Sequence, residues 1–293
     1  MTTRALVLGG GGSLGNAWEI GVLAGLADGG VDPTRAELVV GTSAGATAAA
    51  MIACEAQDVL LAQVLAEAYP APRKPPAAGG APRPGTNFMQ LTADIMATSA
   101  DPVDMRRRIG AAALELESDL GVEIVERRLA QVASRLPSQD WPDRRIVLTA
   151  VDAETGEEVL LDRDSGVALA DAVAASTAVG FGVPPHAIGK QRLLDGGYRA
   201  NENADLASGY DRVLVLSPFG GRSRHPQEWG TALADQVALL KAQGSAVETI
   251  FPDDASREAF GPNMMDLSRR PAAAQAGFDQ GKARAGALEA FWR

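Results

Sequence analysis

Ser43 has the sequence surroundings of a catalytic nucleophile. It is the centre of GTSAG, residues 41–45, which follows the apolar run at 38–40 and precedes a segment rich in alanine. A G-x-S-x-G sequence between a strand and a helix forms a sharp turn that exposes the serine hydroxyl beside a helix N-terminus, where negative charge is favoured. Gly41 and Gly45 lack the Cβ atoms that would collide in this turn. The sequence therefore predicts a nucleophile elbow with Ser43 at its tip.

A run of glycines near the N-terminus is suited to stabilising the negative charge that develops during acyl transfer. The sequence GGGGSLG, residues 9–15, follows a short apolar run and precedes a segment with helical periodicity. Successive glycine N–H groups can approach a ligand closely and bind an oxyanion. We therefore expect Gly10, Gly11 and Gly12 to form the oxyanion hole for attack by Ser43.

The base that would take the proton of Ser43 is either Asp195 or a histidine. His186 and His225 are the two histidines of the sequence, and His225 has the chain order Ser, Asp, His of α/β-hydrolases. Neither histidine has a neighbouring motif that would fix its ring. Asp195 follows an apolar pair and precedes two glycines, and partial removal from water there would raise its pKa toward a useful value. We favour Asp195, although Asp-Gly-Gly is also a common turn sequence.

The elements that must position these residues alternate between strands and helices. Two strands joined by a helix pair in parallel, so the loops after 5–8 and 37–40 open at the same edge of one sheet. The pattern predicts an α/β fold, a three-layer sandwich with a mostly parallel central sheet, in one domain over 1–293. The expected strands are 5–8, 37–40, 145–150, 157–161, 193–194, 212–216 and 247–251, and the expected helices lie within 18–30, 44–69, 105–116, 123–136, 167–178, 227–243 and 271–291.

Residues 70–86 interrupt this alternation with a density of proline and glycine that no packed element tolerates. We predict a loop that is either a lid over the site or a surface insertion without a role. Met89, Met96 and Met105 lie nearby, and they either line an apolar groove under such a lid or belong to the core.

Three motifs stand in the order and at the separations of the patatin-like phospholipase family, which the sequence resembles. They are GGGGSLG at 9–15, GTSAG at 41–45 and DGG at 195–197. The similarity extends to AASTAVGFGVPP at 174–185 and to Asn201 and Ala204. Three ordered motifs are far more specific than any one of them.

The resemblance implies a lipid acyl hydrolase that works through a Ser-Asp dyad without histidine, metal or cofactor. Ser43 would be the nucleophile, Asp195 the general base, and the glycine loop the oxyanion hole. Leu14 departs from the family pattern, because Arg or Lys often stands at this position. Its presence removes a positive charge near the oxyanion and puts full catalytic strength in doubt.

Composition restricts the partners. The net charge of −10 and a pI near 4.8 argue against nucleic acid and against more than transient contact with an anionic membrane. Cys54 is the single cysteine, which excludes an internal disulfide or a cysteine metal cluster. Neither a secretory signal nor an apolar run of about 18 residues is present. We expect a soluble, cytoplasmic protein acting on a lipid or small ester, with the oligomeric state left open.

Two other functions compete with hydrolysis. Residues 10–15 also satisfy the G-x-G-x-x-G pattern of dinucleotide-binding oxidoreductases, but the second expected strand ends in Gly-Thr-Ser rather than in an acidic residue that would hold a ribose. The second alternative is a non-catalytic lipid-binding protein of the same fold, which Leu14 alone supports.

Overall fold

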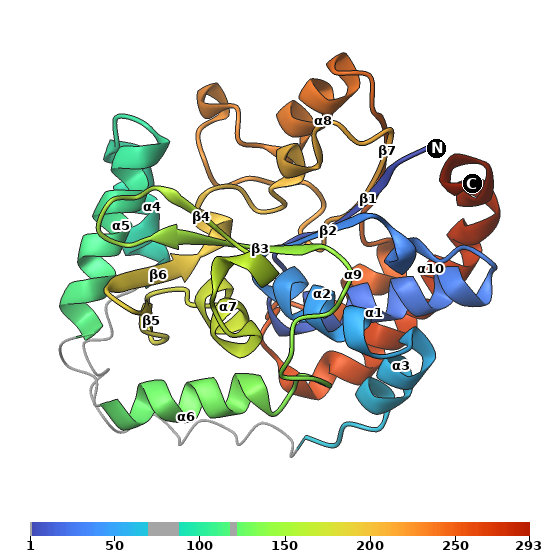
Figure 1. Ribbon diagram of the computed structural model, residues 1–293, viewed down its shortest axis with the longest axis horizontal. Coiled ribbons are helices and arrows are strands. Elements are labelled where there is room, and N and C mark those ends of the chain that lie inside the picture. The colour runs from blue at the N-terminus through green and yellow to red at the C-terminus, as the bar shows by residue number, and fades with distance from the viewer. Residues whose placement is uncertain (1, 70–87, 118–121) are drawn as a thin grey trace.

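The computed structural model describes residues 2–69, 88–117 and 122–293, and in this part of the chain it contains one eight-stranded sheet (Figure 1). Followed from one hydrogen-bonded neighbour to the next, the strands run β5-β6-β3-β2-β1-β7-β8. Within this order β6 and β2 pair with different parts of the same edge of β3, and β4 pairs with its other edge. Five strands are mutually parallel, namely β1 (Arg4–Leu8), β2 (Leu38–Gly41), β3 (Ile146–Asp152), β7 (Arg212–Leu216) and β8 (Ala246–Ile250). An antiparallel part is formed by β4 (Glu158–Leu161), β5 (His186–Ile188) and β6 (Gln191–Asp195).

Helices cover both faces of the sheet, which confirms the predicted three-layer α/β sandwich (Figure 1). Leu6 and Leu8 of β1 face a core formed with α1 (Gly12–Asp28), α2 (Ala44–Cys54) and α10 (Arg270–Trp292). Ala5 and Val7 face the opposite layer, which contains α8 (Leu233–Ala242). The alternation follows from the two-residue period of a strand. The remaining helices are α3 (Gln57–Leu65), α4 (Phe88–Thr98), α5 (Pro102–Glu117), α6 (Val122–Ala133), α7 (Leu169–Ser176) and α9 (Asp254–Phe260).

The predicted strands and most of the predicted helices are confirmed, with three differences. Residues 44–69 form α2 and α3 rather than continuous helix, because Glu55 and Ala56 are extended between them. The helix expected over 227–243 begins only at Leu233, because Gly230 adopts a left-handed conformation (φ 63°) after a short 3-10 turn. The elements α4, α9 and β5 were not expected. The possible lid at 70–86 lies outside the described residues.

The helices α1 and α10 pack with their backbones in contact. A Cβ atom added at Gly21 or Gly25 of α1, or at Gly277 or Gly281 of α10, would lie 2.1–2.4 Å from a backbone carbonyl oxygen of the other helix. No side chain larger than hydrogen fits at these four positions. The packing ties the helix that follows the glycine loop to the last helix of the chain.

We predict that Gly281→Ala lowers the thermal midpoint, because the added methyl group forces α10 away from Val22 of α1 at a cost of about 1–3 kcal/mol. Gly286→Ala is the matched control on the same helix. It has open space around it and should stabilise the protein by about 0.5–1 kcal/mol through helix propensity. Thermal unfolding followed by circular dichroism measures both changes. Equal midpoints for the two variants would contradict the close packing.

Candidate active site

The carboxyl-terminal ends of β2 and β6 meet on one side of β3. Gly41 of β2 pairs with Leu148, and Asp195 of β6 pairs with Ala150, while β4 pairs with both of these β3 residues from the other side. Because β2 runs parallel to β3 and β6 runs antiparallel to it, their ends point toward each other. Ser43 follows Gly41 by two residues. The sheet register therefore brings the predicted nucleophile and the predicted base together.

Ser43 lies in the turn between β2 and α2 with a backbone conformation that is rare for residues other than glycine (φ 54°, ψ −114°). Its N–H donates to the Ser176 hydroxyl at 3.0 Å, which helps to hold the strained residue. A Cβ atom at Gly45 would lie 2.1 Å from the Leu8 carbonyl oxygen. A Cβ atom at Gly41 would lie 2.7 Å from the Gly45 carbonyl oxygen, in the first turn of α2. Both flanking glycines are thus required by close approach of the backbone.

A buried polar network connects the Ser43 turn with the Asp195 turn. Asn203, with a positive φ of 54°, donates from its side-chain amide to the Thr42 hydroxyl (2.9 Å) and to the carbonyls of Ala200 (2.7 Å) and Gly196 (3.2 Å). Thr149 of β3 donates to the same Thr42 hydroxyl at 3.0 Å. Sequence reasoning missed Asn203, and its position two residues after Asn201 carries no signal of this role.

Asp195 is almost fully buried, and its carboxylate accepts the N–H of Gly197 at 2.8 Å. Burial raises the pKa of Asp195 to about 6, although hydrogen bonds from the Ser43 side chain and Gly197 and the charge of Arg128 act to lower it. The backbone N–H of Asp195 donates to the Ala178 carbonyl at 2.8 Å. The carboxyl group can therefore accept and release a proton near neutral pH.

Arg128 of α6 stabilises the end of α7, which holds both site residues. Its guanidinium donates to the Ala174 carbonyl (2.7 Å) and to the Thr177 hydroxyl (2.8 Å). Ser176 and Ala178, in the same segment, bond the backbone N–H groups of the predicted nucleophile and base. Burial lowers the pKa of Arg128 to about 10, so the guanidinium remains charged at neutral pH. Neither its hydrogen bonds nor its charge near Asp195 could be read from the sequence.

The glycine loop follows β1, the neighbour of β2, and only part of it is available to an oxyanion. The N–H of Gly10 donates to the Asn201 carbonyl at 2.9 Å, so this predicted donor is already used within the fold. The N–H of Leu14 donates to the Met264 carbonyl at 3.0 Å. Among the described residues, the N–H groups of Gly11, Gly12 and Ser13 at the start of α1 have no hydrogen-bond partner. These groups can receive a negatively charged oxygen.

The other candidate residues lie apart from this arrangement. His186 is buried against Asp171 (2.8 Å), and the ring of His225 contacts the Thr231 hydroxyl (2.9 Å). No hydrogen bond in the described part of the chain connects either histidine with Ser43 or Asp195. Burial lowers the pKa of both rings, that of His225 to about 4.

Leu14, Met96 and Met105 are all buried in hydrophobic clusters, so the two methionines belong to the core rather than to a groove. The side chain of Met89 lies outside the described residues. Cys54 is a half-buried free thiol.

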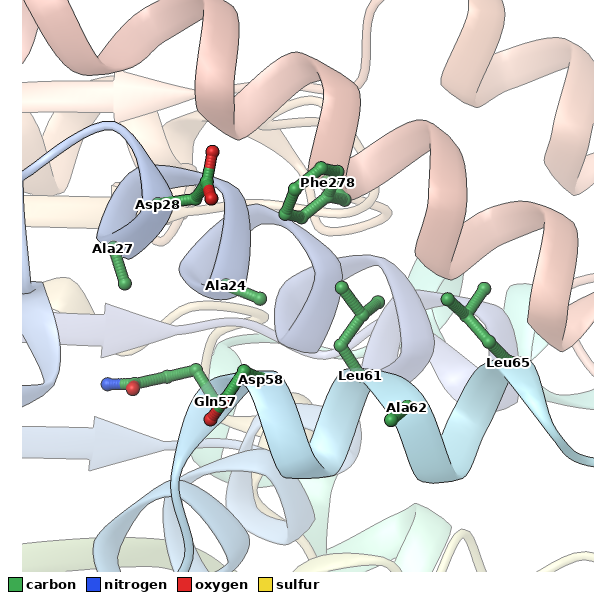
Figure 2. Close-up of a pocket in the computed structure, with 9 residues that line it drawn as sticks. All are labelled: Ala24, Ala27, Asp28, Gln57, Asp58, Leu61, Ala62, Leu65 and Phe278. Carbon is green, nitrogen blue, oxygen red and sulfur yellow. The ribbon is translucent and has the colours of Figure 1, made fainter.

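A surface groove of about 350 Å³ lies between α1, α3 and α10. Leu61, Leu65 and Phe278 are among the lining residues that Figure 2 shows as sticks. It reaches the carboxyl-terminal end of α1 at Asp28, about 25 Å along the helix from the glycine loop. None of its lining residues belongs to the arrangement around Ser43. Within the residues that the structure describes, no three metal-binding side chains gather, and no helix is long and apolar enough to cross a membrane.

Comparisons with known proteins identify the family. The model of the family described as patatin-like phospholipase matches residues 6–208, which include the glycine loop, Ser43 and Asp195. The chain belongs to this family. No curated protein matches the sequence.

Two similar solved structures are VipD from Legionella pneumophila and the type III effector protein ExoU. VipD is 13% identical with a TM-score of 0.41, over 98% of this chain and 67% of VipD. ExoU is 12% identical with a TM-score of 0.32, over 96% of this chain and 53% of ExoU. The chain thus spans about half of the length of ExoU.

We predict that Asp195→Asn stabilises the protein at alkaline pH. The folded-state pKa of about 6 lies above the unfolded value, so folding is progressively penalised as the pH rises from about 4 to 6. The variant should gain up to about 3 kcal/mol in free energy of unfolding above pH 7 and almost nothing below pH 4. Urea unfolding at several pH values measures this difference. A gain independent of pH would show that ionisation of Asp195 is not its source.

A second prediction concerns Arg128. Arg128→Met should raise the pKa of Asp195 by about 0.5–1 unit, because a partly exposed positive charge that favours the carboxylate is lost. Arg128→Lys keeps the charge and is the matched control. The titration is followed by NMR of proteins with labelled aspartate carboxyl groups, in which Asp195→Asn assigns the signal. An unchanged pKa in Arg128→Met would contradict the electrostatic coupling.

Proposed function

We propose that this protein is a serine-dependent acyl-ester hydrolase acting on lipids through a Ser43–Asp195 dyad. The observation that carries the proposal is the position of Asp195, buried at the end of β6 against the Ser43 turn, where burial raises its pKa to about 6 and the Ser43 side chain acts to lower it. A carboxylate with this pKa is ionised at neutral pH and still basic enough to take a proton. Family membership supports the same class of reaction.

The reaction proceeds in two halves. Asp195 takes the Ser43 hydroxyl proton as the serine oxygen attacks the ester carbonyl, and the carbonyl oxygen becomes an oxyanion. Collapse of this intermediate expels the alkoxide, which receives the proton from Asp195 and leaves as an alcohol. In the second half, water loses a proton to Asp195 as it attacks the acyl-serine. Collapse of this second intermediate breaks the bond to the Ser43 oxygen and releases the fatty acid, and Asp195 returns the proton to the Ser43 oxygen.

The oxyanion is stabilised by backbone groups that have no partner among the described residues. Gly11 and Gly12 supply N–H groups from the glycine loop. Ala44, the residue after the nucleophile, supplies a third N–H at the start of α2, which is where serine hydrolases with this type of turn place a donor. Gly10 is left out of this revised set because its N–H is bonded to Asn201.

Exposed apolar side chains near Asp195 and at the glycine loop support an acyl chain as the substrate group. Val179, 39% exposed, follows the residue that bonds the Asp195 N–H. Met265, 64% exposed, lies over the glycine loop, where its sulfur would be 3.0 Å from a Cβ atom at Gly12. The two side chains offer apolar contact at Asp195 and at the loop, as a fatty acyl chain requires.

We predict that the purified protein hydrolyses p-nitrophenyl butyrate and that Ser43→Ala and Asp195→Asn each lower kcat by at least ~10³-fold. The rate should fall below about pH 6 as Asp195 becomes protonated. A fluorophosphonate probe should label the wild type at Ser43 and leave Ser43→Ala unlabelled, and Ser165→Ala serves as the matched serine control.

Wild-type activity in Ser43→Ala would reject the mechanism. A wild type that hydrolyses no member of an ester and phospholipid panel, but binds lipid vesicles, would instead favour a non-catalytic lipid-binding protein of this family.

A further inference from the structure

We propose that Asn201, oriented by Glu202 and Ser217, is a positioning residue that aims the Gly11 N–H at the substrate oxyanion. The inference rests on the proposed function and adds residues that touch neither the substrate nor the dyad. It concerns the loop after Asp195, which crosses from the end of β6 to the glycine loop at the end of β1.

Asn201 holds Gly10 from both sides of the glycine residue. The Gly10 N–H donates to the Asn201 carbonyl at 2.9 Å, and the Asn201 side-chain amide donates to the Gly10 carbonyl at 3.2 Å. A Cβ atom at Gly10 would lie 2.7 Å from the Asn201 side-chain oxygen. The loop therefore lies directly against Asn201, and glycine is required at position 10 by the close approach.

The geometry of the peptide group links the Gly10 carbonyl to the Gly11 N–H. A trans peptide is planar, and its C=O and N–H point in opposite directions. Fixing the Gly10 carbonyl on Asn201 therefore turns the Gly11 N–H away from Asn201. Within the described chain this N–H has no acceptor, so it remains free for a substrate oxygen.

Glu202 orients the amide of Asn201. One oxygen of the Glu202 carboxylate accepts the Asn201 amide at 2.7 Å and the Ser217 hydroxyl at 2.6 Å. Glu202 and Ser217 are both almost fully buried, so water does not compete for these bonds. Ser217 follows β7, the other neighbour of β1, and its hydroxyl accepts the Gly221 N–H at 2.8 Å. The chain of bonds thus anchors the loop to the adjacent strand.

A second buried glutamate lies close to this chain of bonds. Glu19 of α1 is fully buried, and in the described part of the structure neither of its carboxyl oxygens has a hydrogen-bond partner. Burial, together with the nearby Glu202, raises the pKa of Glu19 well above its usual value. Burial also raises the pKa of Glu202, and the hydrogen bonds from Ser217 and Asn201 act to lower it.

The test compares variants along the chain of bonds in two measurements. The first is kcat and KM for p-nitrophenyl butyrate. The second is the affinity for a trifluoromethyl ketone, because attack by a serine converts this ketone into a tetrahedral anion. Asn201→Ala should lower kcat ~10–100-fold, weaken ketone binding by a similar factor and leave KM within ~2-fold, because only the charged intermediate uses the oxyanion donors. Glu202→Ala should behave in the same way. Glu202→Gln should retain most of the activity, because its amide oxygen can accept both hydrogen bonds.

Ser217→Ala should lose part of the ketone affinity, whereas the matched control Ser245→Ala should not. Ser245 is also a buried serine, and it donates to the Tyr210 carbonyl at 2.7 Å, away from the glycine loop. Thermal unfolding of each variant accompanies the kinetics. If Asn201→Ala does not fold, the contrast between Ser217→Ala and Ser245→Ala decides the question.

Unchanged kcat and ketone affinity in Asn201→Ala, or equal losses in the two serine variants, would overturn the positioning role while leaving the proposed function intact. A wild type that neither hydrolyses esters nor reacts with the fluorophosphonate would overturn both.

Discussion

The pairing of β2 and β6 with one side of β3 is the constraint on which the rest of the site depends. The strand β2 ends opposite Leu148 of β3, and β6, which runs in the opposite direction, ends opposite Ala150, two residues further along β3. The residues at these two strand ends must therefore face each other across a short gap. The sheet hydrogen bonds that set this register belong to the best-buried part of the fold. A serine and an aspartate separated by about half of the chain are therefore brought together without help from a flexible loop.

This arrangement carries an energetic cost that the surroundings offset. Ser43 is held in a rare backbone conformation, and Asp195 is a carboxylate removed from water. The end of α7 accounts for much of the compensation, because it bonds the backbone of both residues and is itself capped by Arg128. Strain and buried charge at one place, balanced by hydrogen bonds from several elements, are what an active site requires and what a purely structural turn would avoid.

Local signals in the sequence were sufficient for the fold and for the candidates Ser43 and Asp195. Strand and helix periodicity is local, and so are the glycines of the two turns. The role of Gly10 as an oxyanion donor was predicted from the local glycine run, whereas the use of its N–H depends on a distant contact. The acceptor of this N–H is the Asn201 carbonyl, 191 residues further along the chain. Arg128, Ser176 and Asn203 escaped notice because ordinary residues acquire their roles only through contacts made in three dimensions. The break at Gly230 depends on a positive φ, which the apolar pattern of the segment does not reveal.

The backbone contact between α1 and α10 has a consequence for the chemistry at the other end of α1. Helices that meet through glycine cannot slide past each other without a clash, so the first turn of α1 has a fixed axial position. Arg270, at the start of α10, reinforces this by donating to the Ser13 carbonyl at 2.7 Å. The backbone dipoles at the glycine loop are consequently in place before any substrate arrives. In the proposed reaction, little reorganisation energy then remains to be supplied when charge develops on the bound ester.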